Sequence, residues 1–199
     1  MITKLEAVNR CLQAIGESRV NSLSAGVPDA DEAASIIDEV AHEIQAIGWT
    51  FNTQNSVTLT PTSDKTITVG PSVLRIDTVG RSSHLNVTVR ENSSGQRKLF
   101  NVNDDTYEFV GSVEVMMIRT FEFGSLPYDL SNYIAARATR VFQERVMGSV
   151  SLDSFASRSE QEAWLRLMDA EAEAGDYNTL THSPYVASIT QRNAPYSWR

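Results

Sequence analysis

The stretch Gly48-Trp49-Thr50-Phe51-Asn52 marks the place where the apolar pattern of this 199-residue chain changes. Before it, apolar residues recur every three or four positions, as on one face of a helix. After it they recur every second position, as on one face of a strand. Large aromatic residues at such a change can hold one layer against the other. We therefore expect Trp49 and Phe51 to lie at a junction between a helical body and a β-sheet.

Two amphipathic helices precede this junction. The first is predicted over residues 5–15 and ends at Gly16, because glycine readily takes the left-handed conformation that ends helices. The second is predicted to begin at a capping box formed by Asp29 and Glu32 and to end at Gly48. The apolar stripe predicted for its core consists of Ala33, Ile36, Ile37, Val40, Ile44 and Ile47.

A strand-rich segment follows over residues 56–123. Polar residues separate its apolar positions, which predicts an antiparallel sheet with one face open to solvent and to a partner. The alternating apolar positions are Val57 and Leu59, Ile67 and Val69, Leu74 and Ile76, Val87 and Val89, and Val113, Val115 and Met117.

The helical pattern returns at Pro127, which suits the first turn of a helix because its missing N–H breaks no hydrogen bond there. This third helix is predicted to end at Gly148, and a fourth to run from near Ser151 to Gly175. The apolar positions of the fourth helix are Leu152, Phe155, Ala163, Leu167, Ala170 and Ala174. Its acidic residues are predicted to form a solvated face, and they are Glu160, Glu162, Asp169, Glu171 and Glu173.

Together these patterns predict an α+β fold, a helical bundle of about four helices with an antiparallel β-sheet domain inserted between helices two and three. The predicted domains are a discontinuous bundle of residues 1–52 and 125–180, a β domain of residues 53–124 and an extended tail of residues 181–199. Aromatic side chains after Gly175 are costly to leave in water, which favours docking on a neighbouring surface. They are Tyr177, Tyr185, Tyr196 and Trp198.

Composition narrows the function. The formal net charge of −8 and the pI near 4.9 argue against a nucleic-acid-binding protein, because binding to phosphates needs clustered Lys and Arg. The single cysteine, Cys11, excludes an internal disulfide and lies beside an apolar stripe, which predicts a buried thiol. We also expect neither a signal peptide nor a membrane-spanning segment, because no apolar run is long enough.

No motif predicts a reaction centre, a cofactor or a metal ion. His42, His84 and His182 fall in a helix, the sheet region and the tail, so no two have the spacing of a metal site. Asp104 and Asp105 resemble a carboxylate pair for hydrolysis, but a turn that connects two strands explains them, and we prefer that interpretation. We therefore predict that the protein is not an enzyme.

Several ordered blocks resemble the tail tubular protein A family of short-tailed bacteriophages, the head-to-tail adaptor or gatekeeper. They cover most of the chain, whereas residues 60–94 and the tail beyond His182 match poorly. The blocks are Ala7-Val8-Asn9, Leu12-Gln13-Ala14-Ile15-Gly16-Glu17, Val20-Asn21-Ser22-Leu23, Asp29-Ala30 through Asn52, Lys98-Leu99-Phe100-Asn101, Thr106-Tyr107-Glu108-Phe109, Phe121-Glu122-Phe123 with Leu126-Pro127, Ala138 with Arg140, Phe142, Arg145 and Gly148, and Glu162-Ala163 running to Tyr177-Asn178 and Leu180.

This resemblance implies a structural virion protein that forms a ring of twelve copies beneath the portal protein. The tail nozzle protein lies below the ring, and tail fibres attach near their junction. Genomic DNA passes through the lumen during ejection without specific binding, and the acidic half of the fourth helix is a candidate for a lumen-facing or solvent-facing wall. The implied location is the virion tail, after synthesis in the host cytoplasm. Contacts beyond His182 are not carried over from the family. Because aromatic side chains in the tail favour docking, the residues we expect at the portal or neighbour-subunit interface are Tyr177, Asn178, Tyr185, Tyr196 and Trp198.

Two other functions remain open at this point. One is a virion-associated glycan hydrolase, which needs two carboxyl groups that face each other across a cleft. The other is a non-viral cytosolic binding module with the same layout of helices and sheet. Composition alone does not separate these two from an adaptor.

Overall fold

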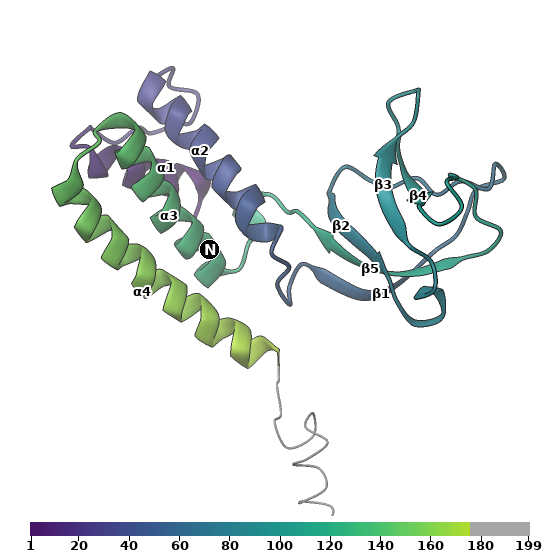
Figure 1. The fold of residues 1–199 in the computed structure, drawn as a ribbon. Coiled ribbons are helices and arrows are strands. Elements are labelled where there is room, and N and C mark those ends of the chain that lie inside the picture. The colour runs from purple at the N-terminus through teal and green to yellow at the C-terminus, as the bar shows by residue number, and fades with distance from the viewer. Residues whose placement is uncertain (176–199) are drawn as a thin grey trace, which may run out of the picture.

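The computed structural model describes residues 1–175, without the side chains of residues 150–152, and shows a helical part beside a β part (Figure 1). The helical part contains α1 (Lys4–Ala14), α2 (Pro28–Gln45), α3 (Tyr128–Val146) and α4 (Val150–Ala174). α3 is the central helix, because α1, α2 and α4 all pack against it. The predicted α+β fold, with strands inserted between the second and third helices, is confirmed.

The core of the helical part follows from the spacing of apolar residues. On α3, Leu130, Ile134, Ala138 and Phe142 recur every fourth position and are all fully or almost fully buried. They face the buried stripes of α1 and α2 in one continuous hydrophobic cluster. Burying one large apolar side chain stabilises a fold by about 1.5–3 kcal/mol, so this stripe fixes the place of α3.

The helix ends correct one prediction. A capping box does form, but on α1, where Thr3 Oγ1 accepts from the Glu6 N–H at 3.2 Å and Glu6 Oε2 accepts from the Thr3 N–H at 2.7 Å. The capping box predicted at Asp29 and Glu32 is wrong. α2 begins earlier, because Pro28 fits the first position of a helix, and this places Asp29 inside the first turn.

Two apolar residues and one proline also lie elsewhere than predicted. α2 ends at Gln45, so Ile47 falls on the turn beyond the helix and is 50% exposed rather than part of the core stripe. Phe155 is 73% exposed and is not part of the hydrophobic cluster, to which α4 contributes Ala163 and Leu167. Pro127 is the residue before α3 rather than a member of its first turn.

The β part contains two small sheets where one was predicted. β1 (Thr53–Leu59), β5 (Val113–Arg119) and β2 (Val73–Thr78) form one antiparallel sheet with β5 in the centre. β3 (Val87–Glu91) and β4 (Arg97–Asn101) form an antiparallel pair. Residues 67–69 join β4 through backbone hydrogen bonds instead of forming a strand of the larger sheet. The two sheets share a second hydrophobic cluster that includes Leu99, Val113 and Val115.

Candidate functional site

Between residues 1 and 175 the chain passes twice between the helical and β parts, after α2 and after β5 (Figure 1). The first passage contains the stretch Gly48–Asn52 and the second contains Thr120 and Phe121. Their geometry decides how the two parts are held together, so we take this junction as the candidate site.

Two buried amide side chains bind the two passages to each other. Gln45 donates to the Phe121 carbonyl at 3.1 Å and accepts from the Phe121 N–H at 2.7 Å. Asn52 donates to the carbonyls of Gln45 and Arg119, both at 2.9 Å, and accepts from the Trp49 N–H at 2.7 Å. Gln45 is 1% exposed and Asn52 2%. Because a buried backbone group without a partner is costly, these two amides fix the path of both passages.

Sequence reasoning missed the role of Gln45. It stands eight positions after Ile37 and four after Ala41, on the buried face of α2 where an apolar residue is the rule. A polar residue at such a position is the signal that reveals a buried hydrogen-bonding group.

The two junction aromatics face different parts of the molecule. Trp49 is 4% exposed, donates from its indole nitrogen to the Ile44 carbonyl at 2.7 Å, and lies edge-on to Trp164 of α4, with ring centroids 6.0 Å apart. Phe51 contacts Phe121 of the other passage, with centroids 5.9 Å apart. Trp49 therefore fastens the junction to the helices, and Phe51 fastens one passage to the other.

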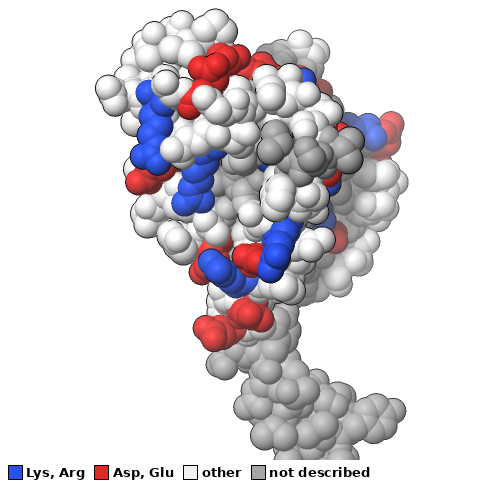
Figure 2. Space-filling model, turned by 90° about the vertical axis from the view of Figure 1, so that its left-hand side faces the viewer, with Lys and Arg blue, Asp and Glu red and all other residues white. Residues whose placement is uncertain are grey.

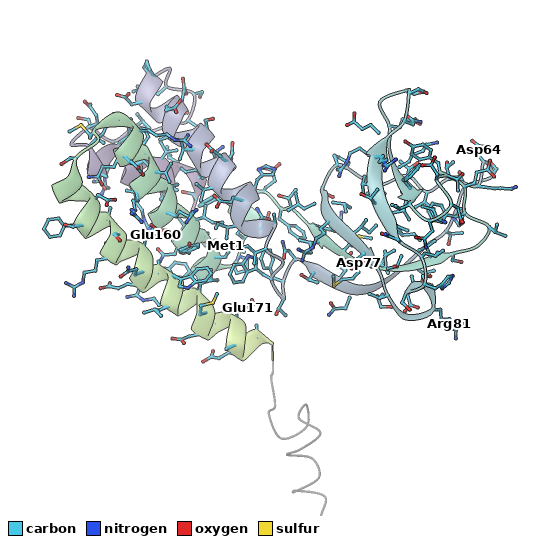
Figure 3. All side chains as sticks on the ribbon, viewed as in Figure 1. Met1, Asp64, Asp77, Arg81, Glu160 and Glu171 are labelled. Atoms are coloured by element: carbon cyan, nitrogen blue, oxygen red, sulfur yellow. The ribbon has the colours of Figure 1, made fainter. Side chains whose placement is uncertain are left out.

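The C-terminal end of α4 also contacts the junction. The Glu171 carboxylate accepts hydrogen bonds from both the N–H and the hydroxyl of Thr50, each at 2.6 Å. Figure 3 shows Glu171 on α4 close to the passage between the two parts. The predicted solvated acidic face of α4 is thus wrong for this residue.

Glu160 is a second exception to that prediction. Its side chain lies between α4 and α3 (Figure 3), is 12% exposed, and pairs with Arg137 at 3.3 Å and Arg140 at 3.0 Å. Asp153 pairs with Arg140 at 2.7 Å, and its hydrogen bond, followed by that of Glu160, raises the pKa of Arg140. Arg137 also reaches Glu43 on α2 at 2.8 Å, so one ionic network joins three helices.

The groups considered for chemistry have structural partners. In the part of the chain that is described, no cluster of His, Cys, Asp and Glu could hold a metal ion. His42 and His84 each contact a backbone carbonyl through Nδ1, whereas His182 lies outside the described residues. Asp104 accepts from Asn101 at 2.8 Å in a turn that follows β4, and the next residue, Asp105, has a positive φ of 51°.

The resolved pKa shifts do not single out a general acid. Burial raises the pKa of the Cys11 thiol, which is fully buried as predicted. Among described carboxyl groups, the resolved shifts are those of Glu6, Glu39 and Glu114, and all three are downward because each accepts hydrogen bonds from a neighbour. A glycan hydrolase needs an acid whose pKa is raised.

The outer surface has mixed charge. Figure 2 looks onto the helical part and shows Lys and Arg interspersed with Asp and Glu, without a continuous positive area on that face. No helix among residues 1–175 is both long and apolar enough to cross a membrane. The interface residues predicted in the tail, Tyr177, Asn178, Tyr185, Tyr196 and Trp198, lie outside the described part of the chain.

The fold and its junction define a class: a two-part α+β protein in which buried amide side chains join the two passages between the parts. The family model described as "Tail tubular protein" matches residues 5–177, so the chain belongs to this family. A curated relative, Tail tubular protein A of Klebsiella phage KP34, is 25% identical over 159 residues, which are 79% of this chain and 81% of the relative. The predicted resemblance is confirmed. The protein is a structural component of a phage tail.

Proposed function

We propose that this tail protein is the head-to-tail adaptor that joins the portal protein to the tail nozzle and forms part of the DNA ejection channel. The observation that carries the proposal is the length of the family match, which runs through both the helical and the β part. A match to only one of the two parts would also be expected for an unrelated protein that contains a single similar domain.

The proposed assembly is a ring of twelve copies, and tail fibres attach near its contact with the nozzle. A ring of identical chains needs heterologous contacts, in which one face of a subunit meets a different face of the next. Two parts of different construction supply two such different faces. We propose that the junction at Trp49 and Phe51 sets the angle between the parts and hence the curvature of the ring.

The charge of the chain suits a channel for DNA. Residues 1–52 and 125–175 carry eight Lys and Arg against sixteen Asp and Glu, and residues 53–124 carry seven against eight. An acidic helical part repels phosphates, so the genome passes without binding. Because Glu160 and Glu171 are engaged within the subunit, Asp169 and Glu173 are the better candidates for the lumen wall.

We propose that the tail residues Tyr177, Asn178, Tyr185, Tyr196 and Trp198 contact the portal or a neighbouring subunit. The protein is then made in the host cytoplasm and joins the virion tail when the portal orders it into a ring. The domain boundaries proposed for this body are residues 1–52 with 125–180, 53–124 and 181–199.

Sedimentation of the chain with its portal tests the proposal. We expect the isolated chain to sediment as a monomer or a weak oligomer, and the mixture with portal to contain a stable complex whose adaptor ring is visible by electron microscopy. A variant with Tyr196→Ala and Trp198→Ala is expected to bind the portal less tightly. If the wild-type chain fails to associate with the portal of its own phage, the adaptor role is wrong.

A further inference from the structure

The helix α4 lies along the outer side of the helical part (Figure 1) and packs against α3. Its buried residues Ala163 and Leu167 belong to the hydrophobic cluster. Two large apolar side chains of the same helix are instead exposed, Phe155 at 73% and Leu165 at 62%. Apolar surface in contact with water gains stability when a partner covers it, so the outer face of α4 is a candidate contact surface.

Four residues form one line along this outer face, because steps of three, four and three positions return to the same side of a helix. They are Phe155, Arg158, Glu162 and Leu165. Arg158 and Glu162, in the middle of the line, form an ion pair at 3.4 Å, and their side chains are 81% and 57% exposed. The line therefore has two charges of opposite sign between two apolar ends, at the spacing of a helix that pairs with another helix.

This line is complementary to itself when a second copy of α4 lies against it in the opposite direction. With position 160 of the two helices at the same level, positions equally far from 160 face each other. Phe155 then faces Leu165 of the second copy, because each is five positions away. Arg158 faces Glu162 of the second copy, because each is two positions away. Every contact occurs twice, as a two-fold axis requires.

The charges on the line select this direction. In a parallel pair with the same residues at the same level, Arg158 would face Arg158 and Glu162 would face Glu162, and such like charges repel. In the antiparallel pair both positions face an opposite charge. Arg166, the next basic residue of α4, then lies opposite Ser154 rather than another cation. Charge complementarity thus identifies a second copy of this chain as the partner.

We propose that two free chains associate through α4 in this antiparallel arrangement, with Phe155 packed on Leu165 and Arg158 paired with Glu162 across the interface. A single helix pair buries less than the roughly 1,200 Å² at which standard interfaces begin, so the dimer dissociates in the micromolar to millimolar range. A two-fold contact stops at two subunits, whereas the proposed ring needs heterologous contacts. The α4 pair is therefore a form of the free chain, and it does not depend on the adaptor role.

Sedimentation equilibrium of the full-length chain up to millimolar concentration tests this pairing. We expect Arg158→Glu and Glu162→Arg each to raise the dissociation constant about tenfold, because each places like charges opposite each other at two symmetric positions. These two variants change the net charge in opposite directions, so general repulsion between chains does not explain equal effects. The variant that carries both changes restores the opposite charges and should dimerise like the wild type.

The matched control is Arg19→Glu, which makes the same change of charge as Arg158→Glu at an exposed position after α1. It should leave the dissociation constant unchanged. All four residue changes are at exposed positions, and the thermal unfolding midpoint of each variant is measured to verify that the fold is kept.

Cysteine cross-linking tests the register. A mixture of Phe155→Cys and Leu165→Cys chains should form a disulfide-linked pair under mild oxidation, because the two positions face each other. Neither variant should link to itself, since equal positions lie ten residues apart along the paired helices, about 15 Å. The native Cys11 is buried.

A wild-type chain that stays monomeric at millimolar concentration would overturn the proposal. A dimer whose dissociation constant is the same in Arg158→Glu, Glu162→Arg and the wild type would also overturn it, as would cysteine variants that link to themselves more readily than to each other. None of these measurements contains the portal. Their failure therefore leaves the adaptor proposal standing, and failure to bind the portal leaves the α4 pair standing.

Discussion

The helical and β parts of this tail protein are stabilised in different ways. Of the described residues, 23 belong to the buried cluster of the helical part and 10 to that of the β part. Since hydrophobic stabilisation grows with buried apolar area, we expect the helical part to have the larger free energy of unfolding. It also carries the ionic network around Glu160, whereas the β part depends on tight loops and on Arg97, which donates to three backbone carbonyls. We infer that the helical part is the more stable of the two and that the β part unfolds more easily.

Phe142→Ala should give the largest loss of stability, in the helical part. The side chain is fully buried at the centre of α3, and its removal leaves a cavity that costs about 3–5 kcal/mol. Denaturant unfolding followed by helical circular dichroism measures the loss. A value below about 1 kcal/mol would show that the helical core repacks, and the comparison between the parts would fail.

Leu99→Ala is the corresponding change in the β part. Leu99 is fully buried in the smaller cluster, and its truncation should cost about 2–5 kcal/mol. Because the β part has the smaller free energy of unfolding, hydrogen exchange should show that the amides of β1–β5 exchange while those of α1–α3 stay protected. Simultaneous opening of both parts would instead mean that the junction makes them one cooperative unit.

Asn52→Ala addresses the junction. The change leaves the Trp49 N–H and the carbonyls of Gln45 and Arg119 without their partner, and we expect a loss of about 1–3 kcal/mol. Asn55→Ala on the exposed face of β1 is the control and should stay within about 0.5 kcal/mol of the wild type. Small-angle scattering should show a wider spread of angles between the parts for Asn52→Ala only. An unchanged profile would show that the aromatic contacts alone set the angle.

Acid should weaken both parts slightly, through different carboxyl groups. Hydrogen bonding to Arg145 lowers the pKa of Glu39 in the helical part, and hydrogen bonding to Ser56 lowers that of Glu114 in the β part. A folded-state pKa below the unfolded value of 4.5 means that the contribution is present above pH 4.5 and is lost as pH falls through the folded pKa. Glu39→Gln should therefore make the free energy of unfolding of the helical part less dependent on pH in the acid range, without affecting the β part. Glu114→Gln should do the same for the β part alone. Both groups are exposed, so the effects are the smallest of the series.

Much of the candidate site could not be read from the chain, because its polar residues act on partners distant in sequence. The change in the spacing of apolar residues predicted Trp49 and Phe51 at the junction. It did not predict that Trp49 contacts Trp164 of α4 whereas Phe51 contacts Phe121 of the second passage. Gln45 acts on Phe121, 76 positions away, and Glu171 on Thr50, 121 positions away. Such pairings leave no local pattern in the sequence.

The sequence by itself determined the class of the protein: four helices, an inserted set of strands and an acidic chain. Periodicity, glycine stops and net charge are local or additive properties, so they need no knowledge of the fold. Only the tertiary structure decided that the strands divide into two sheets and that Glu160 and Glu171 are engaged within the subunit. These outcomes depend on which surfaces meet in space, since the same side chain is solvated or buried according to the partner that packs against it.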